Sequence, residues 1–395
     1  MIITKELCAK CKGRNFCGLK YCPILNQFNA VKIEKDQIEG SNIDVFVGRY
    51  NYPNVNVGII NVPETETKFA EFFSNSKEWI LQKLNIREII TLRSNTLMNY
   101  KNKDVNLVKK DIFNELALSY KPVYISVSLQ SKPIIKLKSF NMLDPFGARA
   151  RFQKIELQDN PKIPSKIENF VNEPARDALV SLSKRFDENY LRKVFSIGSL
   201  GIKKKMVPTR WSITAIDDML SKDMIDKIRS YETIENYEVF FSSLYGNYFI
   251  ILLIPNPFMY ELFEIYTERK ELKLAKAEHD YELYQGRKEY AKITAGGYYA
   301  SRLAVVEYLQ KNKKQASSIV FRFITPEYEF PLGVWVVREA VRKTMNHKIR
   351  TFERLEDSIE FIHGIAKRNF LVDLSSIIKE SQLINLNKQK KITNY

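Results

Sequence analysis

The stretch YEVFFSSLYGNYFIILLI, from Tyr237 to Ile254, predicts two β-strands joined by a tight turn at Tyr245 and Gly246. Its most apolar part, Tyr248–Ile254, is far too short to cross a bilayer. The stretch therefore predicts a β-hairpin within a folded domain and not a membrane span.

The rest of the chain alternates between strand patterns and helix patterns. Further strands are expected at Ile43–Tyr50, Val55–Val62, Pro122–Leu129 and Ser317–Ile324. Helices are expected at Glu66–Leu84, Glu173–Phe195, Gly296–Gln310 and Gly333–Asn346. This mixture predicts an α/β fold of the mixed α+β kind.

The length of the chain predicts more than one structural unit, because 395 residues exceed one ordinary domain. Residues 266–290 are charged, helix-prone and poor in large aliphatic side chains, as expected of a connection between domains. The expected units are an N-terminal metal-binding element (1–30), a large N-terminal α/β domain (31–265), a charged helical connection (266–290), a smaller C-terminal α/β domain (291–378) and a flexible basic tail (379–395).

The composition is typical of a folded soluble protein, with 45% hydrophobic and 27% charged residues. The net charge of +16 favours an anionic partner, usually nucleic acid, although an acidic membrane surface or simple solubility would also fit. The opening residues MIITKELCAK lack the apolar core of a signal peptide. We therefore expect a cytoplasmic protein with no membrane partner.

All four cysteines of the chain lie in the segment CAKCKGRNFCGLKYC, at Cys8, Cys11, Cys17 and Cys22. A structural zinc site needs four thiolates that converge from a short loop, and the first CxxC pair supplies two of them from one turn. With no histidine nearby, four thiolates fill the coordination shell. The segment therefore predicts a structural zinc site with four cysteine ligands.

Two other chemistries compete for these cysteines. Disulfides are disfavoured in a chain that looks intracellular. An iron–sulfur cluster is the sharper alternative, because the final Cys22-Pro23 is typical of ferredoxin motifs. The gaps of five and four residues depart from the ferredoxin spacing, however, and this favours zinc.

The segment SIGSLGIKKKMVPTRWSITAIDD, from Ser196 to Asp218, combines glycines, cations and a tryptophan. Such a loop can contact phosphates through its cations and stack a base on its ring. The candidate nucleic-acid-binding residues are Lys203, Lys204, Lys205, Arg210 and Trp211. The alternative is a basic turn, a buried tryptophan and two aspartates, Asp217 and Asp218, that complement a helix N-terminus. Thr214 and Asp217 are expected to form a capping pair for a helix that runs to about Ser230. Arg49 and Tyr50 could likewise meet a phosphate and a base, or lie on a solvated strand edge.

The sequence contains no known catalytic motif and identifies no catalytic residue. Asp217 and Asp218, with Glu261 and Glu264, could hold Mg²⁺, which gives an alternative function as a metal-dependent nuclease or nucleotide-processing enzyme. Adjacent acids on a helix point to different faces, which weakens this alternative.

The last seven residues, QKKITNY, place Gln389, Ile392 and Tyr395 at the spacing of sliding-clamp-binding peptides. In a short helical turn the two apolar side chains project together, while the glutamine reaches a polar pocket. The lysines of the tail complement an acidic clamp surface. A disordered basic tail without a partner is the alternative.

Together these segments resemble the archaeal Nre family of DNA-repair proteins. The resemblance rests on the cysteine segment and on VFVGRYNYPNVNVG, VPTRWSITAIDD, GGYYASRLAVVEYL and PLGVWVVREAV, which span nearly the whole chain. It implies a zinc-finger-like element at Cys8, Cys11, Cys17 and Cys22. It also implies that Gln389, Ile392 and Tyr395 bind the sliding clamp (proliferating-cell nuclear antigen). The expected function is a nucleoid-associated DNA-repair factor that binds DNA through a basic surface and the zinc element, and docks on the clamp.

Overall fold

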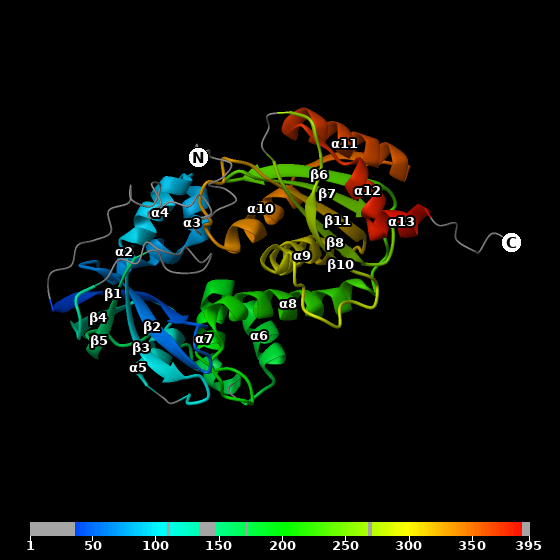
Figure 1. Cartoon of the computed structure of the whole chain (residues 1–395). Helices are drawn as coiled ribbons and strands as arrows, with labels where there is room; N and C mark the ends of the chain where they lie inside the picture. Colours follow the sequence, from blue (N-terminus) through cyan, green and yellow to red (C-terminus); the bar gives the residue numbers. More distant parts are fainter. Residues whose placement is uncertain (1–35, 109–110, 134–146, 171, 268–270, 389–395) are drawn as a thin grey trace. The chain divides into compact units, whose positions relative to one another are not determined.

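The computed structural model describes residues 36–108, 111–133, 147–170, 172–267 and 271–388 (Figure 1). The chain divides into two compact units between Met219 and Leu220. We call residues 36–219 the barrel unit and residues 220–388 the sheet unit. Both contain helices and strands, so the expected mixed α/β fold is confirmed. Within the described ranges, no helix is long and apolar enough to span a membrane.

The barrel unit is built on a closed barrel of five strands in the order β1-β2-β3-β5-β4. The pair β3–β5 is parallel, and the other four neighbouring pairs are antiparallel. The strands are β1 (Gln37–Val47), β2 (Asn54–Pro63), β3 (Leu97–Asp104), β4 (Val123–Leu129) and β5 (Ala148–Leu157).

Alternating apolar residues fill the barrel, as the two-residue period of a strand requires. Val55, Val57 and Ile59 of β2 are fully buried in the barrel core. The helix α5 (Ile112–Leu118), which lies between β3 and β4 in the chain, adds Phe113 to the same core. Each such side chain stabilises the fold by roughly 1.5–3 kcal/mol through its burial. This core fixes which side chains of β2 and β3 face outward.

Two expected helices of the barrel unit are each split into shorter ones. The expected helix Glu66–Leu84 is split, because Asn75 accepts a hydrogen bond from the backbone of Glu78 and begins a new helix. The expected helix Glu173–Phe195 is split by Asp187 in the same way. The resulting elements are α2 (Thr67–Ala70), η2 (Glu71–Ser74), α3 (Ser76–Leu81), α4 (Ile86–Ser94), η3 (Ser165–Phe170), α6 (Ala175–Ser183) and α7 (Glu188–Ser196), and α8 (Thr209–Ile228) spans the boundary between the units.

The sheet unit contains a six-stranded sheet in the order β10-β8-β11-β7-β6-β12. The expected hairpin is confirmed, with Tyr245 (φ 49°) and Gly246 (φ 72°) in the left-handed turn that suits the twist of paired strands. The strands are β6 (Tyr237–Leu244), β7 (Asn247–Ile254), β8 (Tyr260–Tyr266), β10 (Ala277–Glu282), β11 (Ser317–Ile324) and β12 (Lys348–Phe352), and β9 (Lys273–Leu274) pairs separately with β13 (Val372–Asp373).

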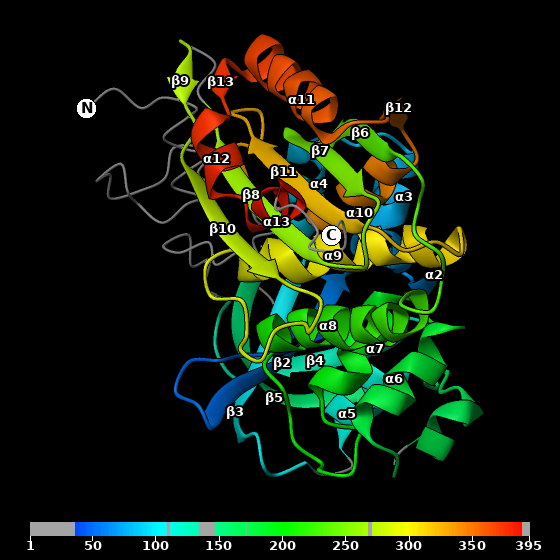
Figure 2. The same cartoon turned by 90° about the vertical axis from the view of Figure 1, so that its right-hand side faces the viewer.

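Helices cover both faces of this sheet, as Figures 1 and 2 show. One face packs against α11 (Leu355–Phe370), α12 (Ser375–Glu380) and α13 (Gln382–Lys388) in one continuous apolar core. The other face packs against α9 (Ala295–Lys311) and α10 (Trp335–Met345). The central strands are therefore apolar on both sides, which explains the long hydrophobic run in β7.

The boundaries of the units differ from those expected from sequence. Strands β9 and β10 lie within residues 266–290, where a charged helical connection was expected, and β10 pairs with β8 along its whole length. The charged residues of β10 are structural, because Glu282 is buried and pairs with Arg302 at 2.7 Å. Charges that are buried in pairs hide the apolar alternation by which a strand is recognised.

The prediction of a flexible basic tail over residues 379–395 is also wrong for the first part of this range. Residues 382–388 form α13, whose Leu383 and Ile384 are buried in the core of the sheet unit. Residues 389–395 lie outside the described residues.

Candidate nucleic-acid interface

Two segments that are far apart in the sequence meet on the surface of the barrel unit: the β1–β2 loop (residues 48–53) and residues 203–211. The rings of Tyr52 and Trp211 lie 5.5 Å apart, centroid to centroid. The Lys205 Nζ atom lies 5.2 Å from the Tyr52 ring. In the same loop, the guanidinium of Arg49 lies 5.0 Å from the Tyr50 ring. We call this group the aromatic–basic cluster, which consists of Arg49, Tyr50, Tyr52, Lys203, Lys205, Arg210 and Trp211.

The three rings of the cluster are exposed. The exposed fractions are 62% for Tyr50, 41% for Tyr52 and 45% for Trp211. The alternative of a buried tryptophan in a basic turn is therefore wrong. Large exposed rings beside cations are the features that nucleic-acid-binding surfaces use for stacking and for phosphate contact.

Lys204 differs from its two neighbours among the candidate residues. Its Nζ atom donates to the backbone oxygen of Ser199 at 3.3 Å, and partial burial lowers its pKa. Lys203 and Lys205 are exposed. We therefore assign Lys204 to holding the loop and leave it out of the cluster.

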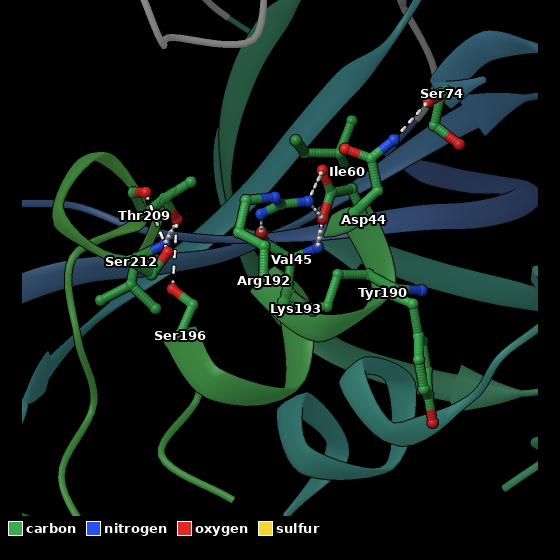
Figure 3. Close-up of polar contacts among 12 residues, drawn as sticks. Asp44, Val45, Ile60, Ser74, Tyr190, Arg192, Lys193, Ser196, Thr209 and Ser212 are labelled. Atoms are coloured by element: carbon green, nitrogen blue, oxygen red, sulfur yellow. Dashed lines mark hydrogen bonds and ion pairs between the residues drawn. The ribbon is translucent and has the colours of Figure 1, made fainter. Parts of the chain in front are cut away.

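A polar network fixes residues 196–212 against β1 (Figure 3). The backbone N–H of Val47 donates to Thr209 Oγ1 at 2.9 Å, and Ser196 Oγ donates to the Val207 oxygen at 2.7 Å. One turn before Ser196 in α7, the Arg192 Nη2 atom lies 2.5 and 2.6 Å from the two carboxylate oxygens of Asp44. The cluster is thus carried on a rigid support.

Backbone hydrogen bonds to Val105 link the two segments. The N–H of Met206 donates to the oxygen of Val105, and the N–H of Val105 donates to the oxygen of Pro53. Gly198 has φ +79°, and a Cβ atom there would lie 2.7 Å from the Lys205 backbone. Only glycine combines this conformation with so close an approach.

The helix α8 begins earlier than its sequence predicts. Its first residue is Thr209, which follows Pro208, so Thr214 lies inside the helix and does not cap it. Thr214 Oγ1 instead bonds back to the oxygen of Trp211 at 3.1 Å. The earlier start places Arg210 and Trp211 in the first turn of α8.

Two of the acidic residues considered for Mg²⁺ have other roles. Glu261 and Glu264 are three residues apart on β8 and face opposite sides of the sheet. Glu264 pairs with Arg322 at 2.6 Å, while Glu261 accepts from Ser381 Oγ at 2.5 Å. Within the described ranges, no group of three or more histidine, cysteine, aspartate or glutamate residues could hold a metal ion.

The other predicted site residues cannot be placed in the structure. Cys8, Cys11, Cys17 and Cys22, expected to bind zinc, lie outside the described residues. The same holds for Gln389, Ile392 and Tyr395, expected to bind the clamp.

Sequence reasoning missed Tyr52 and undervalued Arg49 and Tyr50. For the latter two, the sequence allows a solvated strand edge as well as a contact with phosphate and base. The signal was present in the turn YNYP, because two aromatic residues in a short turn gain no burial from their own strands. Only the contact with Trp211 shows that these rings belong to a larger surface.

The fold and the cluster define the class of the protein. A closed five-stranded barrel in the order β1-β2-β3-β5-β4, with β3 and β5 parallel and a helix between β3 and β4, has the topology of the OB-fold. Proteins with this barrel use the β1–β2 loop and the face of strands 2 and 3 to bind oligonucleotides or oligosaccharides. The chain is thus a two-unit α/β protein with an OB-type barrel.

Sequence comparison places this chain in the archaeal Nre family. The family described as Archaeal Nre, N-terminal, matches residues 16–271, and Archaeal Nre, C-terminal, matches residues 282–395. The family resemblance seen in the sequence is confirmed.

Similar proteins include two from Archaeoglobus fulgidus. DNA repair protein NreB is 33% identical over 395 residues, which cover 98% of each chain. DNA repair protein NreA is 34% identical over 368 residues, which cover 89% of this chain and 92% of the relative. DNA repair protein NreA of Haloferax volcanii is 32% identical over 340 residues, 81% of this chain and 80% of the relative. No solved structure matches the chain significantly.

Proposed function

We propose that this protein is a DNA-repair factor that binds DNA through the aromatic–basic cluster. The observation that carries the proposal is the contact of the exposed Tyr52 ring with Trp211 and Lys205, which come from two distant segments of the barrel unit. Arg49 and Tyr50 form a second cation–aromatic pair in the Tyr52 loop, and Lys203 and Arg210 lie next to the contact in sequence. The cations suit phosphates and the rings suit bases. The net charge of +16 favours the same partner. The names of the relatives, DNA repair proteins NreA and NreB, support a role in repair.

The proposal includes a zinc element and a clamp-binding tail at the ends of the chain. Four thiolates at Cys8, Cys11, Cys17 and Cys22 are a donor set that suits zinc, and the element would add cations to the DNA-binding surface. The peptide from Gln389 to Tyr395 would dock on the sliding clamp. Docking raises the local concentration of the protein at DNA, so each single contact can be weak.

The DNA-binding proposal is tested by fluorescence anisotropy with labelled DNA over a range of salt concentrations. If about six basic residues meet duplex phosphates, the logarithm of the affinity falls with the logarithm of salt at a slope of about −5. Lys205→Ala and Arg210→Ala each weaken binding, and each makes this slope shallower by about 1.

The barrel unit offers a matched control for these variants. Lys68 lies 4.7 Å from the exposed ring of Phe69 on α2, a cation–aromatic pair outside the cluster. This pair follows the far end of β2, on the order of 30 Å from the β1–β2 loop. Lys68→Ala should leave the affinity unchanged. An affinity that ignores salt, or that Lys68→Ala lowers as much as Lys205→Ala does, contradicts the proposal.

A further inference from the structure

The outer face of the OB-type barrel is open next to the aromatic–basic cluster. Asn56 of β2 pairs with Asn102 of β3, and both side chains are exposed. One step further along, Gly58 pairs with Tyr100, and Tyr100 pairs in turn with Arg151 of β5. Arg151 is exposed and Tyr100 is half-buried. These residues form a polar and cationic surface with one aromatic ring.

The other half of the same outer face is closed. Met98 and Ile60 are 2% and 8% exposed, and Ile60 packs in an apolar cluster with Ala70 and Phe73. The open part of β2 and β3 is therefore the end that adjoins the β1–β2 loop, which carries Tyr52. Along the strands, the Asn56–Asn102 pair lies between the β1–β2 loop, which carries Tyr52, and the row formed by Gly58, Tyr100 and Arg151.

Gly58 is buried at the border between the open and the closed parts of this face, where the Met98 Cε atom would lie 3.1 Å from a Cβ atom. A Cβ atom at this position would lie 2.8 Å from the Asn99 oxygen and 3.1 Å from the Tyr100 Cβ atom. A glycine within a strand often marks a site where a ligand or another backbone approaches closely. Here it leaves the strand beside Tyr100 without a side chain.

We propose that this surface binds single-stranded DNA, with bases stacked on the Tyr52–Trp211 pair and on Tyr100. The inference rests on the proposed DNA binding and narrows its substrate. In B-form duplex the base faces are stacked on each other, so exposed protein rings can stack only on unpaired bases. The cations Lys205 and Arg151 lie beside the two stacking positions and complement the phosphates between them.

The test compares a 12-nucleotide oligothymidine with a duplex of equal length, because one OB-fold covers about 4–16 nucleotides. Binding is measured by anisotropy and by quenching of tryptophan emission. Trp211 is half-exposed, Trp79 is buried, and the half-buried Trp335 belongs to the sheet unit. Trp211→Phe should therefore remove most of the quenching while it preserves binding. The single strand should bind more tightly than the duplex by about tenfold or more.

Truncation of the rings separates stacking from general charge attraction. Trp211→Ala and Tyr100→Ala should each weaken single-strand binding by roughly 5- to 150-fold, the range expected for one stacked base, and change duplex binding little. Phe69→Ala, the matched control, should change neither. Lys205→Ala should weaken both.

Two results lead to different conclusions. If the duplex binds as tightly as the single strand, or if Trp211→Ala and Tyr100→Ala leave single-strand affinity intact, the single-strand inference is wrong while DNA binding stands. If neither form binds, the proposed function itself is wrong.

Discussion

Burial changes the pKa of one residue of the barrel unit, Lys193 of α7. Its Nζ atom donates to the backbone oxygen of Ser119 at 3.2 Å and lies 5.5 Å from the Tyr190 ring. Burial lowers its pKa to about 8, although the nearby carboxylate of Asp44 opposes this shift. The charged form of this lysine therefore opposes folding at neutral pH.

This lowered pKa predicts a pH dependence of stability. Between pH 8 and about 10.5, the lysine keeps its proton in the unfolded chain and loses it in the folded protein. The unfolded state then binds more protons, so the free energy of unfolding rises with pH in this window. Lys193→Met should abolish the rise, as measured by urea denaturation between pH 7.5 and 9.5.

The measurement stops below pH 10 because buried tyrosines act in the opposite direction at higher pH. Burial raises the pKa of Tyr260, so ionisation of this tyrosine in the unfolded chain lowers stability at higher pH. Lys77→Met, at an exposed position, is the matched control and should keep the rise. A rise of equal size in Lys193→Met would contradict the assignment.

At the scale of elements, helix α13 depends on one buried carboxylate of the neighbouring sheet. Glu261 of β8 accepts hydrogen bonds from Ser381 Oγ at 2.5 Å, from the Gln382 N–H at 2.9 Å and from the Leu383 N–H at 3.2 Å. It also lies 2.7 Å from the ring nitrogen of His279. A carboxylate at a helix N-terminus satisfies amide groups that lack a partner within the helix.

Glu261→Gln should therefore loosen α13. The amide side chain cannot accept all these bonds, and the loss should cost about 1–3 kcal/mol of stability. Hydrogen exchange of the Gln382–Lys388 amides should accelerate, and the melting temperature should fall. Glu380→Gln is the matched control, since Glu380 is exposed and lies at the end of α12. Unchanged exchange in Glu261→Gln would show that the cap has no such role.

The sequence predicts some strands correctly but misses one strand and overestimates the length of two helices, and each outcome has a physical reason. The strands β6, β7 and β11 occupy the expected residues. The apolar runs of β7 and β11 are buried on both faces, and the hairpin turn at Tyr245 and Gly246 pairs β6 with β7. The strand β10 was missed, because its buried charges pair with partners that are remote in sequence, such as Arg302. The expected long helices were split by Asn75 and Asp187, whose capping bonds depend on the local path of the backbone.

At the scale of the whole molecule, the proposed clamp-binding motif lies outside the described residues. The last described residue of α13 is Lys388, and the motif begins at Gln389. Removal of residues 389–395 should abolish capture of the organism's own sliding clamp and leave the melting temperature unchanged. Tyr395→Ala should act like the deletion, while Asn394→Ala should bind normally. Clamp capture by the deleted protein would contradict the proposal.

The zinc proposal is tested by metal analysis of the purified full-length protein. We expect about one zinc per chain, and Cys11→Ala should lower this content without unfolding the barrel unit. Lys12→Ala, inside the same segment, should retain the metal. Iron with visible absorbance, or cysteines that are oxidised in pairs, would contradict a zinc site.

The sequence by itself determined the mixed α/β class, the central hairpin, the family and the cationic character of the chain. These properties depend on local periodicity, on motifs and on summed charge, which are present before folding. The candidate residues Lys203, Lys205, Arg210 and Trp211 were also found from their types alone.

Only the tertiary structure decided that these residues form a surface with Arg49, Tyr50 and Tyr52. The two segments are far apart in the sequence, and hydrogen bonds such as the one from Val47 to Thr209, 162 positions apart, join their neighbourhoods. The barrel order and the position of Tyr100 beside Arg151 were equally hidden, because strand pairing is a long-range choice. Whether a ring is buried or exposed follows from what packs against it, and no local pattern in the chain specifies that.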